Sequence, residues 1–203
     1  MTTKEKILKA ALQLFNKHGI SSITVRDIAK EIGISHGNLC YHYPATNDII
    51  QALYDELSRK VNDLLDKLEP NENVFQMHSN AIRTIFTLAN KYKFFYLHFI
   101  EITKRIPALG KKHYQLIEER KTQIRYFFDI LRQNDLFRKD LPQEQYELLI
   151  MHCFLYGDFW ISSSEVLYKG PQSEKINYYV NGYFGLFMPY LTEKGKQQAD
   201  KII

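Results

Sequence analysis

Closely spaced helix start and stop signals divide the first part of the chain, residues 1–43, into short segments. Thr2 and Glu5 have the spacing of a capping box, in which each side chain pairs with the other residue's backbone N–H. Gly19 follows as a stop signal, since glycine adopts the left-handed turn at a helix end without strain. Apolar residues recur at helical spacing between these signals: Ile7, Leu8, Ala11, Leu12 and Phe15. The segment therefore predicts one amphipathic helix.

Two more start signals follow at once. Thr24 can cap a second helix with Asp27 at its third position, and this helix ends at Gly33. Ser35 can cap a third helix directly afterwards. The small Ala29 lies four residues before Gly33, where two closely crossing helices need a small side chain. This arrangement predicts a helix-turn-helix.

The third helix, expected over residues 36–43, contains few residues that favour a helix on a protein surface. Leu39 is its obvious core residue, and the positions around it are polar, aromatic or glycine. Side chains of this kind suit DNA, because Asn can pair with adenine in the major groove and Tyr or His can reach backbone oxygens. The composition of this helix therefore indicates a DNA-reading surface.

Residues 24–29 (TVRDIA) and 33–43 (GISHGNLCYHY) together are similar to the signature of the tetracycline-repressor family of bacterial regulators. The resemblance implies that the first three helices form a DNA-binding head. On matching positions it implies these DNA-binding residues: Val25, Arg26, Ser35, His36, Gly37, Asn38, Tyr41 and His42. The chain departs from the family at Cys40, where tyrosine is common, and at Thr46, where lysine is common. Thr46 can instead cap the fourth helix and offer its hydroxyl to a phosphate.

Several residues of the head can have a structural role instead of contacting DNA. Tyr43 can close the core of the head or contact DNA, and Cys40 is expected to be a packing residue. Arg26 and Lys30 can contact phosphates or lie on a solvated face. Phosphate contact is the stronger expectation for Arg26, because it lies in the first turn of the second helix.

The rest of the chain shows helical periodicity, with no alternating strand pattern, internal repeat or low-complexity segment. Helices are expected over residues 47–68, 73–92, 94–106, 107–133, 142–167 and from 174 onward, with a break at Glu69-Pro70 and a kink or end at Pro189. We therefore expect an all-α fold of two domains. Residues 1–46 would form the helix-turn-helix DNA-binding domain, and residues 47–203 a helical effector-binding and dimerisation domain.

The last two expected helices carry more apolar surface than a monomer covers easily. The helix at 142–167 is apolar nearly all round, and the last helix has an aromatic stripe. By the resemblance, they form a two-fold four-helix interface between two copies of the chain. The expected interface residues are Phe159, Tyr179, Tyr183, Phe184 and Phe187. A monomeric bundle with the same stripe turned inward is the alternative.

Polar side chains inside these apolar helices are candidate contacts for a small-molecule effector. They are His78, His98, Arg125, Tyr126, Tyr156 and Trp160. The aromatic content of 14%, concentrated outside the head, favours an apolar or planar effector. Two alternatives stay open: these residues are ordinary core residues, or the C-terminal domain binds a protein partner instead of a small ligand.

Composition narrows the class of protein further. The net charge of +4 is compatible with a polyanionic partner such as double-stranded DNA. The two cysteines lie far apart, which excludes a disulfide framework and a four-cysteine zinc site. No apolar run approaches the roughly 20 residues that cross a membrane, and the charged N-terminus does not resemble a secretion signal. We expect a cytoplasmic protein without a membrane partner.

An all-helical enzyme, such as a carboxylate-bridged di-iron protein, is the main rival from another class. That site needs Glu-x-x-His pairs on facing helices, and the sequence contains none. It also lacks a nucleophile elbow and a phosphate loop. His152 and Cys153 do not form a metal pair, because neighbours on a helix point about 100° apart. We expect a regulator with no enzymatic activity, cofactor or metal.

Overall fold

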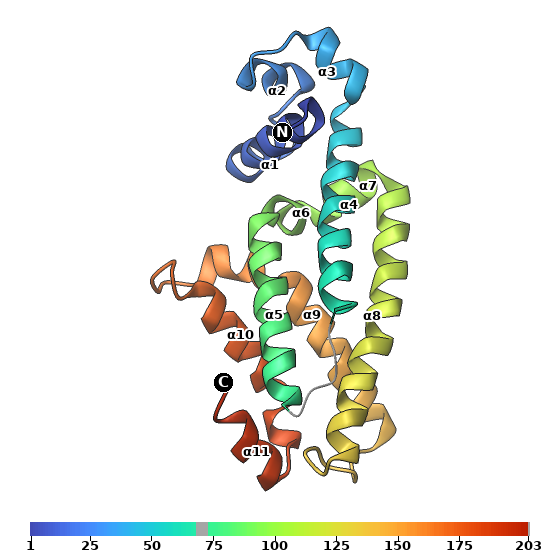
Figure 1. Cartoon of the computed structure of the whole chain (residues 1–203), viewed down its shortest axis with the longest axis vertical. Helices are drawn as coiled ribbons and strands as arrows, with labels where there is room; N and C mark the ends of the chain where they lie inside the picture. The colour runs from blue at the N-terminus through green and yellow to red at the C-terminus, as the bar shows by residue number, and fades with distance from the viewer. Residues whose placement is uncertain (68–72, 203) are drawn as a thin grey trace. The chain divides into compact units, whose positions relative to one another are not determined.

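The computed structural model describes residues 1–67 and 73–202. Within these residues the regular structure is helical, apart from one isolated antiparallel β-bridge between Phe137 and Leu191 (Figure 1). The expected all-α fold is therefore confirmed. The expected helix break at Glu69-Pro70 lies outside the described residues.

The chain divides into two compact units. Unit 1 contains Met1–Asp63 and Ala89–Lys111, and unit 2 contains Leu64–Leu88 and Lys112–Ile203. These units differ from the expected domains, because unit 1 joins the head to most of the following helix and to a second, distant segment. A functional boundary between residues 46 and 47 stays a prediction.

The first two helices begin at the capping boxes that the sequence predicts. They are α1 (Thr3–His18) and α2 (Val25–Glu31). At the start of α1, the Thr2 hydroxyl accepts from the backbone N–H of Glu5 at 3.3 Å, and the Glu5 carboxylate accepts from the Thr2 N–H at 2.7 Å. Gly19 ends α1 with φ 78°, a conformation that favours glycine.

The turn between α2 and α3 (His36–His42) also follows the sequence prediction. Gly33 has φ 68°, so the chain reverses there without the strain that another residue would cause. The Ser35 hydroxyl accepts from the backbone N–H of Asn38 at 3.2 Å and caps α3.

The start of α4 (Thr46–Leu65) differs from the expectation. Thr46 is the first residue of the helix rather than its cap. The backbone N–H of Ala45 donates to the Asp48 carboxylate at 2.8 Å, so Asp48 satisfies a backbone donor at this helix start. The capping role expected of Thr46 is therefore corrected.

The single helix expected over residues 94–106 is interrupted. Two short helices, α6 (Lys93–Leu97) and α7 (Phe99–Arg105), meet at His98, which has φ −113° and ψ 21°. The rings of Phe94 and Phe95 lie in the core of unit 1. The ring centroids of Phe94 and Phe15 of α1 are 5.3 Å apart. Phe95 packs on Tyr54 of α4, with ring centroids 4.9 Å apart.

Asn16 links α1 to this second segment of unit 1 through its side-chain amide. The amide N–H donates to the carbonyl of Lys91 at 2.8 Å, and the amide oxygen accepts from the backbone N–H of Phe94 at 2.9 Å. One side chain thus satisfies two backbone groups where the helical ladder is interrupted.

Unit 2 is built from parts of two long helices and from the C-terminal elements. They are α5 (Val74–Lys91), α8 (Pro107–Gln133), α9 (Gln143–Leu167), α10 (Lys175–Gly185), the 3-10 turn η1 (Met188–Tyr190) and α11 (Glu193–Ala199). Its core is aromatic, and its fully buried rings include Phe75, Phe128, Phe137, Trp160, Phe184 and Phe187.

The end of the chain contains a helix that the sequence analysis missed. α10 ends before Pro189, as expected, and Pro189 lies in η1. α11 follows, with the Thr192 hydroxyl accepting from the backbone N–H of Gly195 at 3.1 Å. The same hydroxyl donates to the carbonyl of Asp135 at 2.7 Å. Thr192 followed by Glu193 was a usable start signal.

Candidate nucleic-acid interface and sensor core

The buried side of the helix-turn-helix fixes the position of α3. Ile28 and Ala29 of α2 and Leu39 of α3 are buried, and the backbone N–H of Ile34 donates to the carbonyl of Ala29 at 3.0 Å. A larger side chain at Ala29 would separate the two helices. These contacts hold α3 by one face and leave the opposite face at the surface.

The opposite face of α3 presents the residues that the sequence analysis selected. His36, Gly37 and Asn38 are exposed in its first turn, and Tyr41 is 85% exposed one turn later. Arg26 is exposed in the first turn of α2. The structure therefore brings these polar and aromatic groups to the surface of one helix-turn-helix.

Two contacts between side chains order this surface. The rings of Tyr41 and His42 meet edge to face with centroids 5.2 Å apart. The Cys40 sulfur lies 3.3 Å from Nε2 of His36, so Cys40, which is half-buried, contacts the adjacent turn of its own helix. Ser35 uses an oxygen lone pair for capping, which leaves its O–H able to donate to a phosphate.

The remaining candidates of the head are less exposed. Val25, His42 and Thr46 are half-buried, whereas Lys30 is exposed. Tyr43 is half-buried, and this burial, together with the charge of Glu56, raises the pKa of its hydroxyl. Tyr43 therefore stays neutral and keeps a proton to donate, which is compatible with both roles that the sequence left open.

The candidate effector residues do not form a single cluster. His78 is buried in unit 2, where its ring stacks on Phe127 at 3.7 Å and its Nε2 lies 3.3 Å from the Tyr183 hydroxyl. Burial lowers the pKa of His78 to about 3, so the imidazole is neutral at physiological pH.

Tyr156 and Trp160 belong to the same aromatic region. The Trp160 and Phe86 rings are nearly parallel, with their centroids 5.0 Å apart. The Tyr183 ring meets Phe86 edge to face, with a centroid distance of 6.1 Å. Tyr156 is half-buried beside Phe86, with their ring centroids 6.4 Å apart. His78, Tyr156 and Trp160 are therefore connected through Phe86 and Tyr183.

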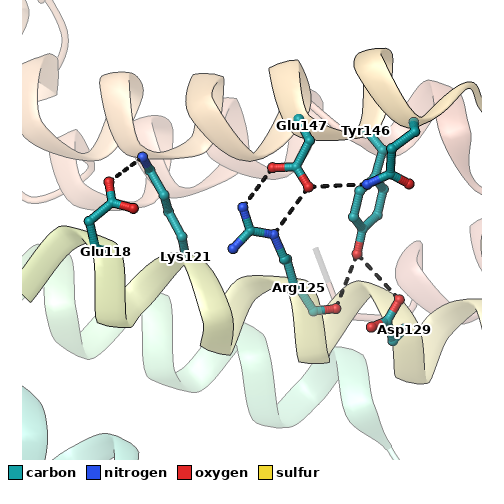
Figure 2. Close-up of polar contacts among 7 residues, drawn as sticks. Glu118, Lys121, Arg125, Asp129, Tyr146 and Glu147 are labelled. Carbon is teal, nitrogen blue, oxygen red and sulfur yellow. Dashed lines mark hydrogen bonds and ion pairs between the residues drawn. The ribbon is translucent and has the colours of Figure 1, made fainter.

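Arg125 and Tyr126 lie outside this aromatic core. Figure 2 shows Arg125 of α8 directed toward Glu147 of α9, to which it donates two hydrogen bonds of 3.1 and 2.6 Å. Tyr146 donates to the carbonyl of Arg125 at 3.2 Å and so braces the same contact (Figure 2). Tyr126 is 61% exposed. Arg125 therefore links α8 to α9 near the surface, and Tyr126 takes no part in the aromatic core.

His98, the last candidate, lies in unit 1. Its Nδ1 is 3.5 Å from the Glu101 carboxylate, which also accepts a hydrogen bond from the Ser21 hydroxyl. The candidates thus divide into a buried group in unit 2, a surface group on α8 and one residue of unit 1.

Comparisons with known proteins agree with this arrangement. Residues 7–53 match the bacterial regulatory proteins of the tetR family, and residues 56–199 match the TetR family of bacterial transcriptional repressors. The chain belongs to the tetR family. It is a DNA-binding transcriptional regulator, and its helix-turn-helix is the DNA-binding element of that family.

Individual relatives are distant in sequence. The chain is 24% identical over 88 residues to the probable regulator YttP of Bacillus subtilis, covering 43% of this chain and 42% of YttP. It is 24% identical over 162 residues to the regulator BetI of Cronobacter sakazakii, covering 71% of this chain and 70% of BetI. A TetR-family regulator from Marinobacter aquaeolei VT8 has the same fold, with a TM-score of 0.89, 23% identity and coverage of 99% and 97%.

The residues expected at a family-type dimer interface are mostly inside one subunit. Tyr179, Tyr183, Phe184 and Phe187 are buried within unit 2, and Phe159 alone among the five expected residues is exposed, at 45%. The aromatic stripe of α10 therefore packs inward, as in the alternative that the sequence analysis left open. Phe159 belongs to a set of exposed apolar residues at helical spacing on α9: Leu148, Met151, Leu155 and Phe159. We name this set the α9 stripe.

Two further findings concern other functions. Among the described residues, no group of three or more His, Cys, Asp and Glu side chains is placed to hold a metal ion. No helix in this part of the chain combines the length and apolarity needed to span a membrane.

Proposed function

We propose that this tetR-family regulator is a cytoplasmic repressor that binds a near-palindromic operator as a homodimer and leaves it when a small apolar or aromatic effector binds. The exposed face of α3, carried on the buried Leu39, is the observation that supports operator recognition. Polar groups on a helix of a helix-turn-helix are placed to reach base edges in the major groove.

Each candidate residue of the head has a role that follows from its chemistry. Asn38 pairs with adenine, because its amide offers one donor and one acceptor. Tyr41 and His42 reach phosphate or base edges, and Arg26 binds a phosphate beside the groove. Val25, Ser35, His36 and Gly37 complete the surface at the start of α2 and α3, and Thr46 offers a hydroxyl at the start of α4.

The α9 stripe supports dimerisation. Four large apolar side chains on one face of a helix are costly in water, and a second copy of the chain would cover them with its own stripe. Two heads related by a two-fold axis then read both halves of a palindrome. An effector that binds one spacing of the heads better than another shifts the operator affinity by that difference.

Operator recognition is tested by DNA fragments selected from the genome and measured by fluorescence anisotropy. Asn38→Ala and Tyr41→Ala are expected to weaken binding to the selected operator by about 1–3 kcal/mol, because each removes a groove contact. Tyr126→Ala is the matched control, since Tyr126 is also an exposed tyrosine but lies on α8. Equal affinities for all four proteins would show that α3 does not read the operator.

A further inference from the structure

Trp160 has an unusual indole N–H. Its side chain is 2% exposed, and its Nε1 has no hydrogen-bond acceptor within the part of the chain that the structure describes. Buried donors are nearly always paired, because losing water without gaining a partner costs free energy. Trp160 is also the sole tryptophan of the chain. This donor therefore needs an explanation from its surroundings.

Phe86 and Tyr179 contact the Trp160 ring, and Tyr156 and Tyr183 pack against Phe86 beside it. We name the set the aromatic box: Phe86 of α5, Tyr156 and Trp160 of α9, and Tyr179 and Tyr183 of α10. Phe86 is inclined to the Trp160 ring by 5°, and Tyr179 lies 5.2 Å from Trp160. Because Phe86 packs face to face with Trp160 and with Tyr156, a flat molecule can take the place of one of these rings more readily than a branched one.

The aromatic box carries no charge. Burial raises the pKa of Tyr156 to about 12 and raises the pKa of Tyr183 well above its usual range, so both hydroxyls stay protonated. Three charged groups on these helices have partners outside the box: Lys175 lies 3.5 Å from Glu165, Asp158 lies 3.6 Å from His113, and Arg83 donates to Asn177. A charged ligand would lose its hydration here without gaining a counter-charge. The box therefore selects against ions.

Tyr156 occupies the most accessible position of the box. Its side chain is half-buried, and its hydroxyl lies where the Cβ of any larger residue at Gly182 would be. Gly182 therefore allows Tyr156 to lie across the α10 backbone. Since the contact involves the far end of a flexible side chain, Tyr156 can turn outward without a change in the helices.

We propose that the aromatic box binds an uncharged planar molecule with a carbonyl-type acceptor, which pairs with the Trp160 N–H after Tyr156 turns outward. This inference names the effector class for the proposed repressor and rests on that function for its regulatory meaning. The ligand replaces the Tyr156 ring against Phe86 and supplies the acceptor that Trp160 lacks. The tryptophan thus determines which planar molecules are retained.

The proposal is tested with three probes of similar size, measured by calorimetry on the full chain. Acetophenone is planar and has a carbonyl, ethylbenzene lacks the acceptor, and benzoate is charged. Acetophenone is expected to bind about tenfold more tightly than either other probe, because only it pairs with the buried donor without carrying a charge. Its binding should also change the fluorescence of Trp160.

Trp160→Phe separates the hydrogen bond from the packing. This variant keeps an aromatic ring and removes the N–H. It should therefore bind acetophenone and ethylbenzene with about equal affinity. Tyr146→Phe is the matched control, because it removes a paired hydroxyl outside the box and should leave the preference unchanged. Circular dichroism establishes that both variants are folded. The preference of the wild-type chain for acetophenone over ethylbenzene tests the proposal without relying on either variant.

Gly182→Ala tests the movement of Tyr156. The added Cβ meets the Tyr156 hydroxyl and should hold that side chain outward. Both neutral probes should therefore bind at least about threefold more tightly than they bind the wild-type chain. Gly185→Ala is the matched control on the same helix, because its Cβ meets no neighbour within 4 Å. Unchanged affinity in Gly182→Ala would remove the proposed role of Tyr156.

The outcomes distinguish this inference from the proposed function. Intact operator binding without any preference for acetophenone overturns the aromatic box and leaves the regulator. A preference that persists in Trp160→Phe also overturns it. A Trp160-dependent preference in a protein that recognises no operator supports the box and removes the proposed function.

Discussion

Unit 1 and unit 2 use the same types of side chain in opposite surroundings. Tyr41 of α3 is 85% exposed beside His42, whereas Tyr183 of α10 is buried with its hydroxyl against His78. Tyr41 can form new hydrogen bonds at the surface without breaking its packing. The buried pair must break packing before it binds anything. Exposure, rather than residue type, therefore separates the candidate DNA-reading surface from the candidate sensor core.

The largest expected effect concerns the core of unit 2. Phe184→Ala should lower the free energy of unfolding by about 3–5 kcal/mol, because it leaves a cavity among packed rings. Tyr114→Ala, at an exposed position of α8, should change it by less than about 0.5 kcal/mol. Urea denaturation measures both values. Similar losses for the two variants would contradict the inward packing of α10.

The α9 stripe provides the next test. Leu155→Arg should weaken dimerisation by at least about 2 kcal/mol, because it places a charge within an apolar contact surface. Thr122→Arg, on the exposed face of α8, is the control and should leave the dimer intact. Sedimentation equilibrium gives the association constants. A stable Leu155→Arg dimer would exclude the α9 stripe as the interface.

The third test uses the pH dependence of stability. His78 has a pKa of about 3 in the folded chain and about 6.5 when unfolded, so the unfolded state takes up the proton first as the pH falls. Its neutral form therefore supports folding above pH 6.5, and this contribution is lost progressively below that value. Between pH 6.5 and 5 the loss should be about 2 kcal/mol.

His78→Gln should remove this part of the pH dependence, while His18→Gln, at an exposed position, should retain it. Urea denaturation at the two pH values provides the comparison. An identical pH dependence in all three proteins would show that the folded chain already accommodates a charged His78.

The smallest expected effect separates phosphate contacts from base contacts. Arg26→Ala should reduce the slope of log affinity against log salt concentration by about one and weaken binding to all duplexes alike. Asn38→Ala should instead act on particular base pairs. Lys196→Ala, in α11 of unit 2, is the charge control. An unchanged slope in Arg26→Ala would place Arg26 on a solvated face.

The head was predictable from sequence because its signals are local. Thr2 with Glu5, and Thr24 with Asp27, pair across one helical turn, so their hydrogen bonds follow from spacing alone. Gly33 likewise marks a turn through its own backbone freedom. Such interactions need no knowledge of the rest of the fold.

The sensor core was less predictable because its contacts join distant residues. The periodicity of α10 identified an apolar stripe, but it could not show that Tyr183 and Phe184 face His78 rather than a second subunit. Arg125 looked like a polar group within an apolar helix until Glu147, on another helix, proved to be its partner. Periodicity predicts that a face is covered and does not identify what covers it.

The Asn16 amide has a practical consequence for protein engineering. Its partners, the Lys91 carbonyl and the Phe94 N–H, lie far along the chain but within the same compact unit. A chimera that transplants residues 1–46 onto another sensor would leave these partners behind. Exchanging residues 89–97 together with the transplanted segment should preserve these two hydrogen bonds, so a domain swap with this chain needs two exchanged segments instead of one.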